Sequence, residues 1–187
     1  MTIPKIREKL QTAVDPKRFE HILGVAETAA YLGCIYGEDR ERCEIAGLLH
    51  DCAKCYSHER LYELCMEAGI RLSEGLKASP QLWHAVYGPV EAESYGITDP
   101  GILDAIRYHT TGKAAMTLLE KILFVSDYIE PHRDKAKDLR ELRILAVNDL
   151  DKCTARIMQQ TIEYLNEHGT AIDGETLEAF AYYQQYL

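Results

Sequence analysis

The chain has 187 residues, of which 47% are hydrophobic and 27% charged, and it carries a net charge of −9. A domain of this length can bury about 70% of its extended surface, so neither a structural metal nor a disulfide is needed for folding. No apolar run approaches the roughly 18 to 20 residues of a bilayer span, and the N-terminus lacks the apolar stretch of a signal peptide. We therefore expect a cytoplasmic protein without membrane contact, forming a single domain over residues 1–187 with reduced cysteines.

The spacing of apolar residues predicts an all-α fold, because strand patterns and hairpin turns are scarce. The boundaries carry helix signals, such as proline directly after Asp99 and Pro131 after a long apolar pattern. In chain order, we expect helices over about 15–37, 38–54, 59–68, from 80 through 84, then 99–109, 117–130, 150–165 and 175–186.

Metal-ligand residue types lie on several of these helices. The pair His50-Asp51 closes the helix predicted over 38–54, and alone it would be weak support for a metal site because such pairs occur by chance. Imidazole and carboxylate together favour a transition metal such as iron, manganese, cobalt or zinc over magnesium, which prefers oxygen ligands. The other candidate ligands, in chain order, are His21, His84, His109 and Asp127.

The order of these residues on helices is that of HD-domain phosphohydrolases. Three strings go further: LLHDCAK at 48–54, HTTG at 109–112 and SDYIEPHR at 126–133. They resemble the YqeK family of bacterial HD-domain hydrolases, which cleave diadenosine tetraphosphate symmetrically to two ADP. The resemblance extends over about residues 18–170. It implies a helical HD-domain bundle with the metal site between core helices.

The resemblance also implies a centre of two divalent ions, with Asp51 as a bridging ligand and catalytic residue. A water between the ions would ionise near neutral pH and attack phosphorus. Iron is the leading candidate for the metal, with manganese, cobalt or zinc as alternatives. One ion would be held by His21, His50, Asp51 and Asp127, and the other by Asp51, His84 and His109.

Substrate contacts are expected near these ligands. Lys54 follows Asp51 by three residues, so on a continuing helix it would share that face and stabilise charge on a phosphate, whereas the alternative is a solvated lysine. Arg133 offers a two-pronged donor for phosphate. We expect Thr110, Thr111 and Gly112 either to bind phosphate or simply to end the helix.

The remaining candidates carry weaker expectations. Cys52 and Cys55 have Cys-x-x-Cys spacing, but without a preceding strand or a second pair we expect neither redox chemistry nor structural zinc. Trp83 fits a core position better than a base-stacking one. Solvent-facing positions are expected for His58, His132 and His168, and an interface role stays open for Tyr182, Tyr183 and Tyr186.

The leading hypothesis is thus a metal-dependent hydrolase of a small nucleotide, with homodimer formation left open. The alternatives are an HD-domain phosphatase acting on mononucleotides or deoxynucleotides, and a regulatory HD module that binds nucleotide without hydrolysis. The complete ligand series argues against the regulatory module. The acidic net charge excludes a broad basic groove for nucleic acid, but two ions would still make the reacting centre locally positive.

Overall fold

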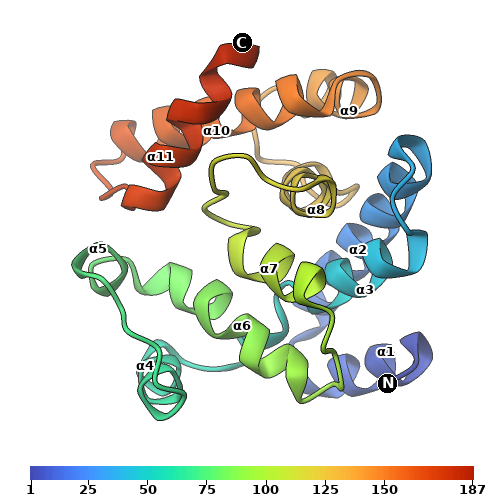
Figure 1. Ribbon diagram of the computed structural model, residues 1–187, viewed down its shortest axis with the longest axis vertical. Helices are drawn as coiled ribbons and strands as arrows, with labels where there is room; N and C mark the ends of the chain where they lie inside the picture. Colours follow the sequence, from blue (N-terminus) through green and yellow to red (C-terminus); the bar gives the residue numbers. More distant parts are fainter.

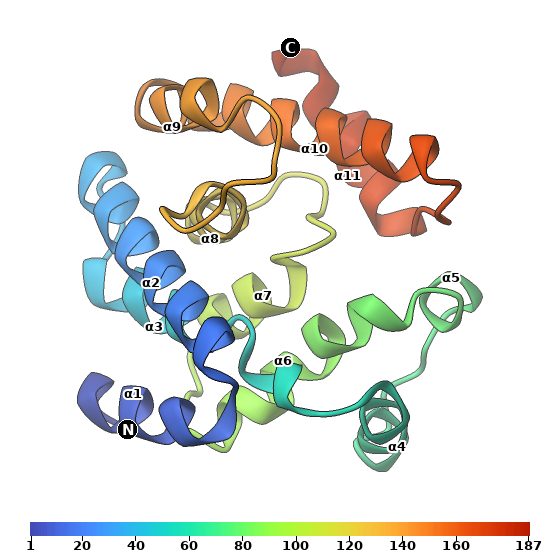
Figure 2. The same ribbon diagram turned by 180° about the vertical axis from the view of Figure 1, so that it is seen from behind.

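The chain folds entirely into helices and connecting segments, as the computed structural model of residues 1–187 shows in two opposite views (Figures 1 and 2). The expected all-α class is confirmed. None of the helices combines the length and apolar character that a bilayer crossing requires. The α-helices and short 3₁₀ turns (η) are α1 Ile3–Ala13, α2 Pro16–Tyr36, α3 Arg40–Leu49, η1 Cys52–Cys55, α4 His58–Glu67, α5 Glu74–Lys77, η2 Pro80–Leu82, α6 Trp83–Glu93, α7 Pro100–Tyr108, α8 Leu118–Ile129, α9 Leu139–Asn148, α10 Leu150–Glu167, α11 Gly174–Tyr183 and η3 Gln184–Tyr186.

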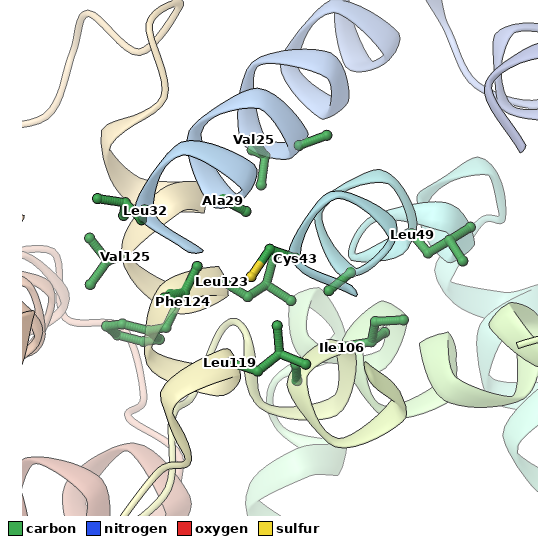
Figure 3. Packing of buried hydrophobic residues seen from close by; sticks show 14 of the residues in the cluster. Val25, Ala29, Leu32, Cys43, Leu49, Ile106, Leu119, Leu123, Phe124 and Val125 are labelled. Atoms are coloured by element: carbon green, nitrogen blue, oxygen red, sulfur yellow. The ribbon is translucent and has the colours of Figure 1, made fainter. Parts of the chain in front are cut away.

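Helix α8 is the centre of the bundle. It is seen nearly end-on in Figure 1, and α2, α3, α7 and α10 pack around it. Its start is fixed by a capping box, in which the Thr117 hydroxyl accepts from the Glu120 amide and the Glu120 carboxylate accepts from the Thr117 amide. Apolar side chains from α2, α3, α7 and α8 interdigitate beside it (Figure 3). Because α8 is anchored on several sides, the polar residues at its C-terminal end are held in place.

Helices α2 and α3 approach each other unusually closely, because small residues line their contact. A Cβ atom added at Gly47 would lie 2.5 Å from the Cα of Ala26 and 2.9 Å from its backbone nitrogen. This approach brings His21, on α2, to the end of α3, where His50 lies.

A smaller apolar cluster joins α4 and η2 to α6, on the side away from α9, α10 and α11 (Figure 1). Trp83 belongs to this cluster and donates its indole N–H to the carbonyl of Leu76 at 2.7 Å. The expected core position of Trp83 is confirmed.

The structure corrects the predicted helix over 38–54. Helix α3 ends at Leu49, His50 caps it, and the backbone at Asp51 (φ −108°, ψ 17°) leaves the α-region before η1 begins. The 50–51 pair therefore lies at a break between helices. Three helices also escaped prediction, α1, α5 and α9. The N-cap of α9, Asp138, has a left-handed backbone (φ 55°) and makes no side-chain cap.

The close approach of α2 and α3 makes Gly47 a sensitive position. We expect Gly47→Ala to lower the free energy of unfolding by about 3 kcal/mol, because the added methyl group meets backbone that cannot move aside. Chemical denaturation measures the change. Gly174→Ala is the control, since a Cβ there meets nothing within 4 Å, and it should change stability by less than about 1 kcal/mol. Equal effects of the two substitutions would contradict the packing argument.

Candidate metal centre

Three of the four expected histidine ligands are oriented by the same local hydrogen bond. In each, the ring Nδ1 donates to the backbone carbonyl three residues earlier at 2.7 Å, so in the neutral ring Nε2 is the nitrogen with the lone pair. Two of these histidines cap helices α3 and α7, where the last carbonyls lack partners within the helix. The donor and acceptor pairs are His50 with Gly47, His84 with Gln81 and His109 with Ile106.

The rings of His84 and His109 face each other in an unusual way. Their Nε2 atoms lie 3.3 Å apart, and both rings already use Nδ1 as the donor. Burial lowers the pKa of His84 to about 4, outweighing the attraction of Asp51, so this ring is neutral at pH 7. The unprotonated Nε2 of His84 therefore faces a second imidazole nitrogen in a site where the two residues are only 4% and 3% exposed. A cation between the rings would give both nitrogens a partner.

A second pair of imidazoles lies beside the first. The Nε2 atoms of His21 and His50 are 3.3 Å apart, and Asp127 Oδ1 lies 3.1 Å from that of His21. Burial lowers the pKa of His21, but the hydrogen bonds and charges of Asp127 and Glu130 outweigh it, so the pKa is raised. A metal ion bound at this pair would displace the His21 proton.

Asp51 stands between the two pairs and presents one oxygen to each. Its Oδ1 lies 3.3 Å from Nε2 of His84 and 3.6 Å from that of His109. Its Oδ2 faces the other pair, 3.5 Å from His50 and 3.8 Å from His21. Burial disfavours the Asp51 anion, yet the surrounding histidines hold its pKa well below the usual value.

Two groups of side chains could thus each hold a metal ion, with Asp51 common to both. Asp127 lies beside His21 and His50. The nitrogen and oxygen donors are those that iron, manganese, cobalt and zinc accept. The groups are His21, His50 and Asp51, and Asp51, His84 and His109.

Two arginines pair with the carboxylates of the site. Arg18 Nη1 donates to Asp51 Oδ2 at 2.7 Å, and Arg133 Nη2 donates to Asp127 Oδ1 at 3.0 Å. Arg18 was missed in the sequence, although it precedes His21 by one helical turn on α2, the spacing that places two side chains on one face. The structure therefore adds Arg18 to the candidate residues.

Glu130 is a second residue that the sequence did not single out. Its Oε1 accepts from Nδ1 of His21 at 3.2 Å, and its Oε2 accepts from the amide of His132 at 2.7 Å. The side chain is buried, so it fixes the orientation of the His21 ring. Its place in the string at 126–133, next to a predicted ligand helix, is the signal that could have found it.

A cavity of about 210 Å³ opens beside Asp51, and we call it the central cavity. Lys54 and Thr110 line it together with both arginines, although Lys54 sits on the 3₁₀ turn η1 and not on a continuing helix. The residues that line it are Arg18, Asp51, Lys54, Gln81, His84, His109, Thr110, Asp127 and Arg133.

Thr111 and Gly112 do not line the central cavity. The buried Thr111 hydroxyl donates to the carbonyl of Gly112 at 3.0 Å, and its other neighbour is a carboxylate of α11. Gly112 has φ +66°, and a Cβ there would lie 2.5 Å from the Cε of Met158 on α10. We therefore withdraw both residues from the expected phosphate contacts, since they hold the turn after α7 against α10 and α11.

The sequence pattern of the HD domain family matches residues 18–132. The chain belongs to the HD-domain family. Over 186 residues it is 33% identical to the symmetrical bis(5'-nucleosyl)-tetraphosphatase of Staphylococcus aureus, covering 98% of this chain and 95% of that protein. A Bacillus subtilis protein of the same name is 37% identical over 161 residues, with 85% of each chain covered. The expected membership of the YqeK-like group of HD-domain hydrolases is confirmed.

A solved HD-domain structure extends the similarity to the whole fold. It is the crystal structure of a predicted HD superfamily hydrolase involved in NAD metabolism from Clostridium acetobutylicum, 38% identical to this chain. The two superpose with a TM-score of 0.95, covering 100% of this chain and 99% of the other. The arrangement of helices around the candidate metal centre is therefore shared with an HD-domain relative.

The orienting role of Glu130 can be tested by metal binding alone. We expect Glu130→Gln to weaken Co²⁺ binding about tenfold, because the amide N–H₂ would face either the His132 amide or the protonated Nδ1 of His21. Visible absorption of the bound Co²⁺ gives the dissociation constant. Glu8→Gln, at an exposed position of α1, is the matched control, and Co²⁺ binding unchanged in Glu130→Gln would contradict the role.

Proposed function

We propose that this chain binds two divalent transition-metal ions and hydrolyses diadenosine tetraphosphate symmetrically to two ADP. The observation that carries the metal part is the contact of the His84 and His109 Nε2 atoms, whose rings both donate through Nδ1, beside a carboxylate that faces a second imidazole pair. The substrate part is supported by relatives that share most of their length with this chain and are named symmetrical bis(5'-nucleosyl)-tetraphosphatases.

Iron is the leading candidate for the metal, with manganese, cobalt or zinc as alternatives, since four imidazoles and two carboxylates suit these ions better than magnesium. When bound, such ions supply Lewis acidity toward phosphate oxygens and a water that ionises near neutral pH. The chain's own contribution is to hold the ligands in place. Its Nδ1 hydrogen bonds and Glu130 keep every Nε2 pointed inward before metal or substrate arrives.

Positive side chains on both sides of Asp51 suit a substrate whose polyphosphate crosses the centre. Arg18 and Arg133 lie on the His21 side, where they hold the carboxylates of Asp51 and Asp127. Lys54 lies on the other side, where its charge helps to lower the pKa of His84. We assign these three cations to phosphate oxygens on either side of the bond that is cut, where they stabilise charge growing in the transition state.

The leading function and its alternatives differ in their products. Cleavage at the middle of the tetraphosphate gives two ADP, whereas asymmetric cleavage gives ATP and AMP. A phosphatase for mononucleotides or deoxynucleotides would release inorganic phosphate from those substrates, and a regulatory module would bind nucleotide without any product. A small free nucleotide as substrate, together with six unpaired cysteines, also supports a cytoplasmic location.

The central test uses Asp51→Asn on the metal-loaded enzyme. We expect the parent to release two ADP per tetraphosphate and the variant to lose about a thousandfold in kcat, because Asn cannot offer an anionic oxygen to both imidazole pairs. Chromatography of the nucleotides identifies the products. Asp104→Asn, at an exposed position of α7, should behave as the parent does. ATP plus AMP from the parent, or a fully active Asp51→Asn, would refute the proposed function.

Removing the Arg18 guanidinium tests its assignment to phosphate. We expect Arg18→Ala to lower kcat/KM for diadenosine tetraphosphate about a hundredfold, since a charge that faces the central cavity is lost. Metal content, measured by elemental analysis, should stay at the parent level because Arg18 is no ligand. Loss of metal together with loss of activity would instead show that Arg18 supports the metal ligands.

A further inference from the structure

Three cavities meet at a single side chain, Arg133. It lines the central cavity and also two larger ones, of about 620 and 520 Å³. The segment 135–136 lines both larger cavities, so the chain between α8 and α9 forms the wall between them. Both volumes fall in the range of about 300–1,000 Å³ typical of small-molecule sites. A ligand with its phosphates in the central cavity could therefore extend past Arg133 into one of them.

The 620 Å³ cavity offers little to a base. Its lining holds four basic side chains and four carboxylates, and Ala136 is its only apolar member. No aromatic ring other than the His21 and His132 imidazoles faces it, and the His21 ring is held by Asp127 and Glu130. The basic and acidic side chains of this lining balance, and it offers little apolar surface for a purine.

The 520 Å³ cavity has the aromatic surface that the other cavity lacks, and we call it the tyrosine cavity. Tyr128 and Tyr164 line it, together with Glu163 and Glu167 of α10. Tyr164 is 59% exposed, and its ring packs on His168, with the two centroids 4.1 Å apart and an interplanar angle of 32°. This exposure leaves aromatic surface open to a ligand. The carboxylates beside it can accept hydrogen bonds from the exocyclic amino group of adenine.

We propose that the tyrosine cavity binds one adenine base of the dinucleotide, with Tyr164 as the stacking platform. This assignment rests on the proposed function. Arg133 joins the two places, because its Nη2 atom contacts Asp127 at the metal centre and its side chain lines the tyrosine cavity as well. Lys135 and Lys137 also line this cavity, and we assign them to the phosphate attached to the ribose.

The other aromatic candidate fails on geometry. Trp83 is only 8% exposed, its indole N–H is bonded to the Leu76 carbonyl, and Tyr62 and His58 cover its ring. A base could reach it only if the small apolar cluster around α4 opened. Tyr164 needs no such rearrangement.

The test compares the binding of ADP with that of pyrophosphate, which has no base, to the metal-loaded protein. By calorimetry, we expect Tyr164→Ala to weaken ADP binding about tenfold, as loss of one base-aromatic stack does, and to leave pyrophosphate binding within twofold. Tyr164→Phe keeps the ring and should bind ADP as the parent does. Tyr31→Ala, which removes an equally exposed tyrosine from α2, is the matched control and should bind both ligands normally.

Two results would overturn the assignment: unchanged ADP binding in Tyr164→Ala, or an equal loss of ADP and pyrophosphate binding. Cross-linking with 8-azido-ADP locates the base directly, and we expect the label on peptides from 128–137 or 159–167. A label on α4 or α6 peptides would also overturn it. Failure of the proposed function is a different result, in which the parent enzyme releases no ADP from the tetraphosphate whatever residue occupies position 164.

Discussion

The constraint on which the site depends is the close approach of imidazole Nε2 atoms whose rings already donate through Nδ1. At His84 and His109 both Nδ1 atoms are committed to backbone carbonyls, so in the neutral rings neither Nε2 carries a proton to donate across the 3.3 Å that separates them. In a buried setting this arrangement costs free energy unless a cation is shared between the rings. The Asp51 carboxylate, turned to both imidazole pairs, supplies the negative charge that would hold such cations.

The fold makes this arrangement possible through its helix ends. Two of the imidazoles lie at helix ends, where they donate to carbonyls that the helix leaves without a partner. The same hydrogen bond therefore caps the helix, α3 or α7, and orients the metal ligand. The absence of a side chain at Gly47 lets α2 come close enough to bring His21 beside His50. The acidic net charge of the chain stays compatible with a polyphosphate because Arg18, Lys54 and Arg133 line the central cavity.

Long periodic patterns and ligand residue types were readable from the sequence, whereas local geometry was not. The amphipathic pattern of α10 and the expected start of α7 after Asp99 correspond to helices, but α1, the four-residue α5 and α9 were missed. The break after Leu49 was hidden because the apolar spacing continues through Cys52 into the 3₁₀ turn. Arg18 and Glu130 act through side-chain contacts that join distant parts of the chain, and Thr111 turns its hydroxyl away from the cavity, so their roles became visible only in three dimensions.

The most direct test of this account is a crystal structure of the metal-loaded protein with anomalous diffraction recorded at the metal edge. We predict two peaks, one between Nε2 of His84 and His109 and one between Nε2 of His21 and His50, with one oxygen of Asp51 turned to each. A saturated crystal with no peak between His84 and His109, and their Nε2 atoms still in contact, would contradict it.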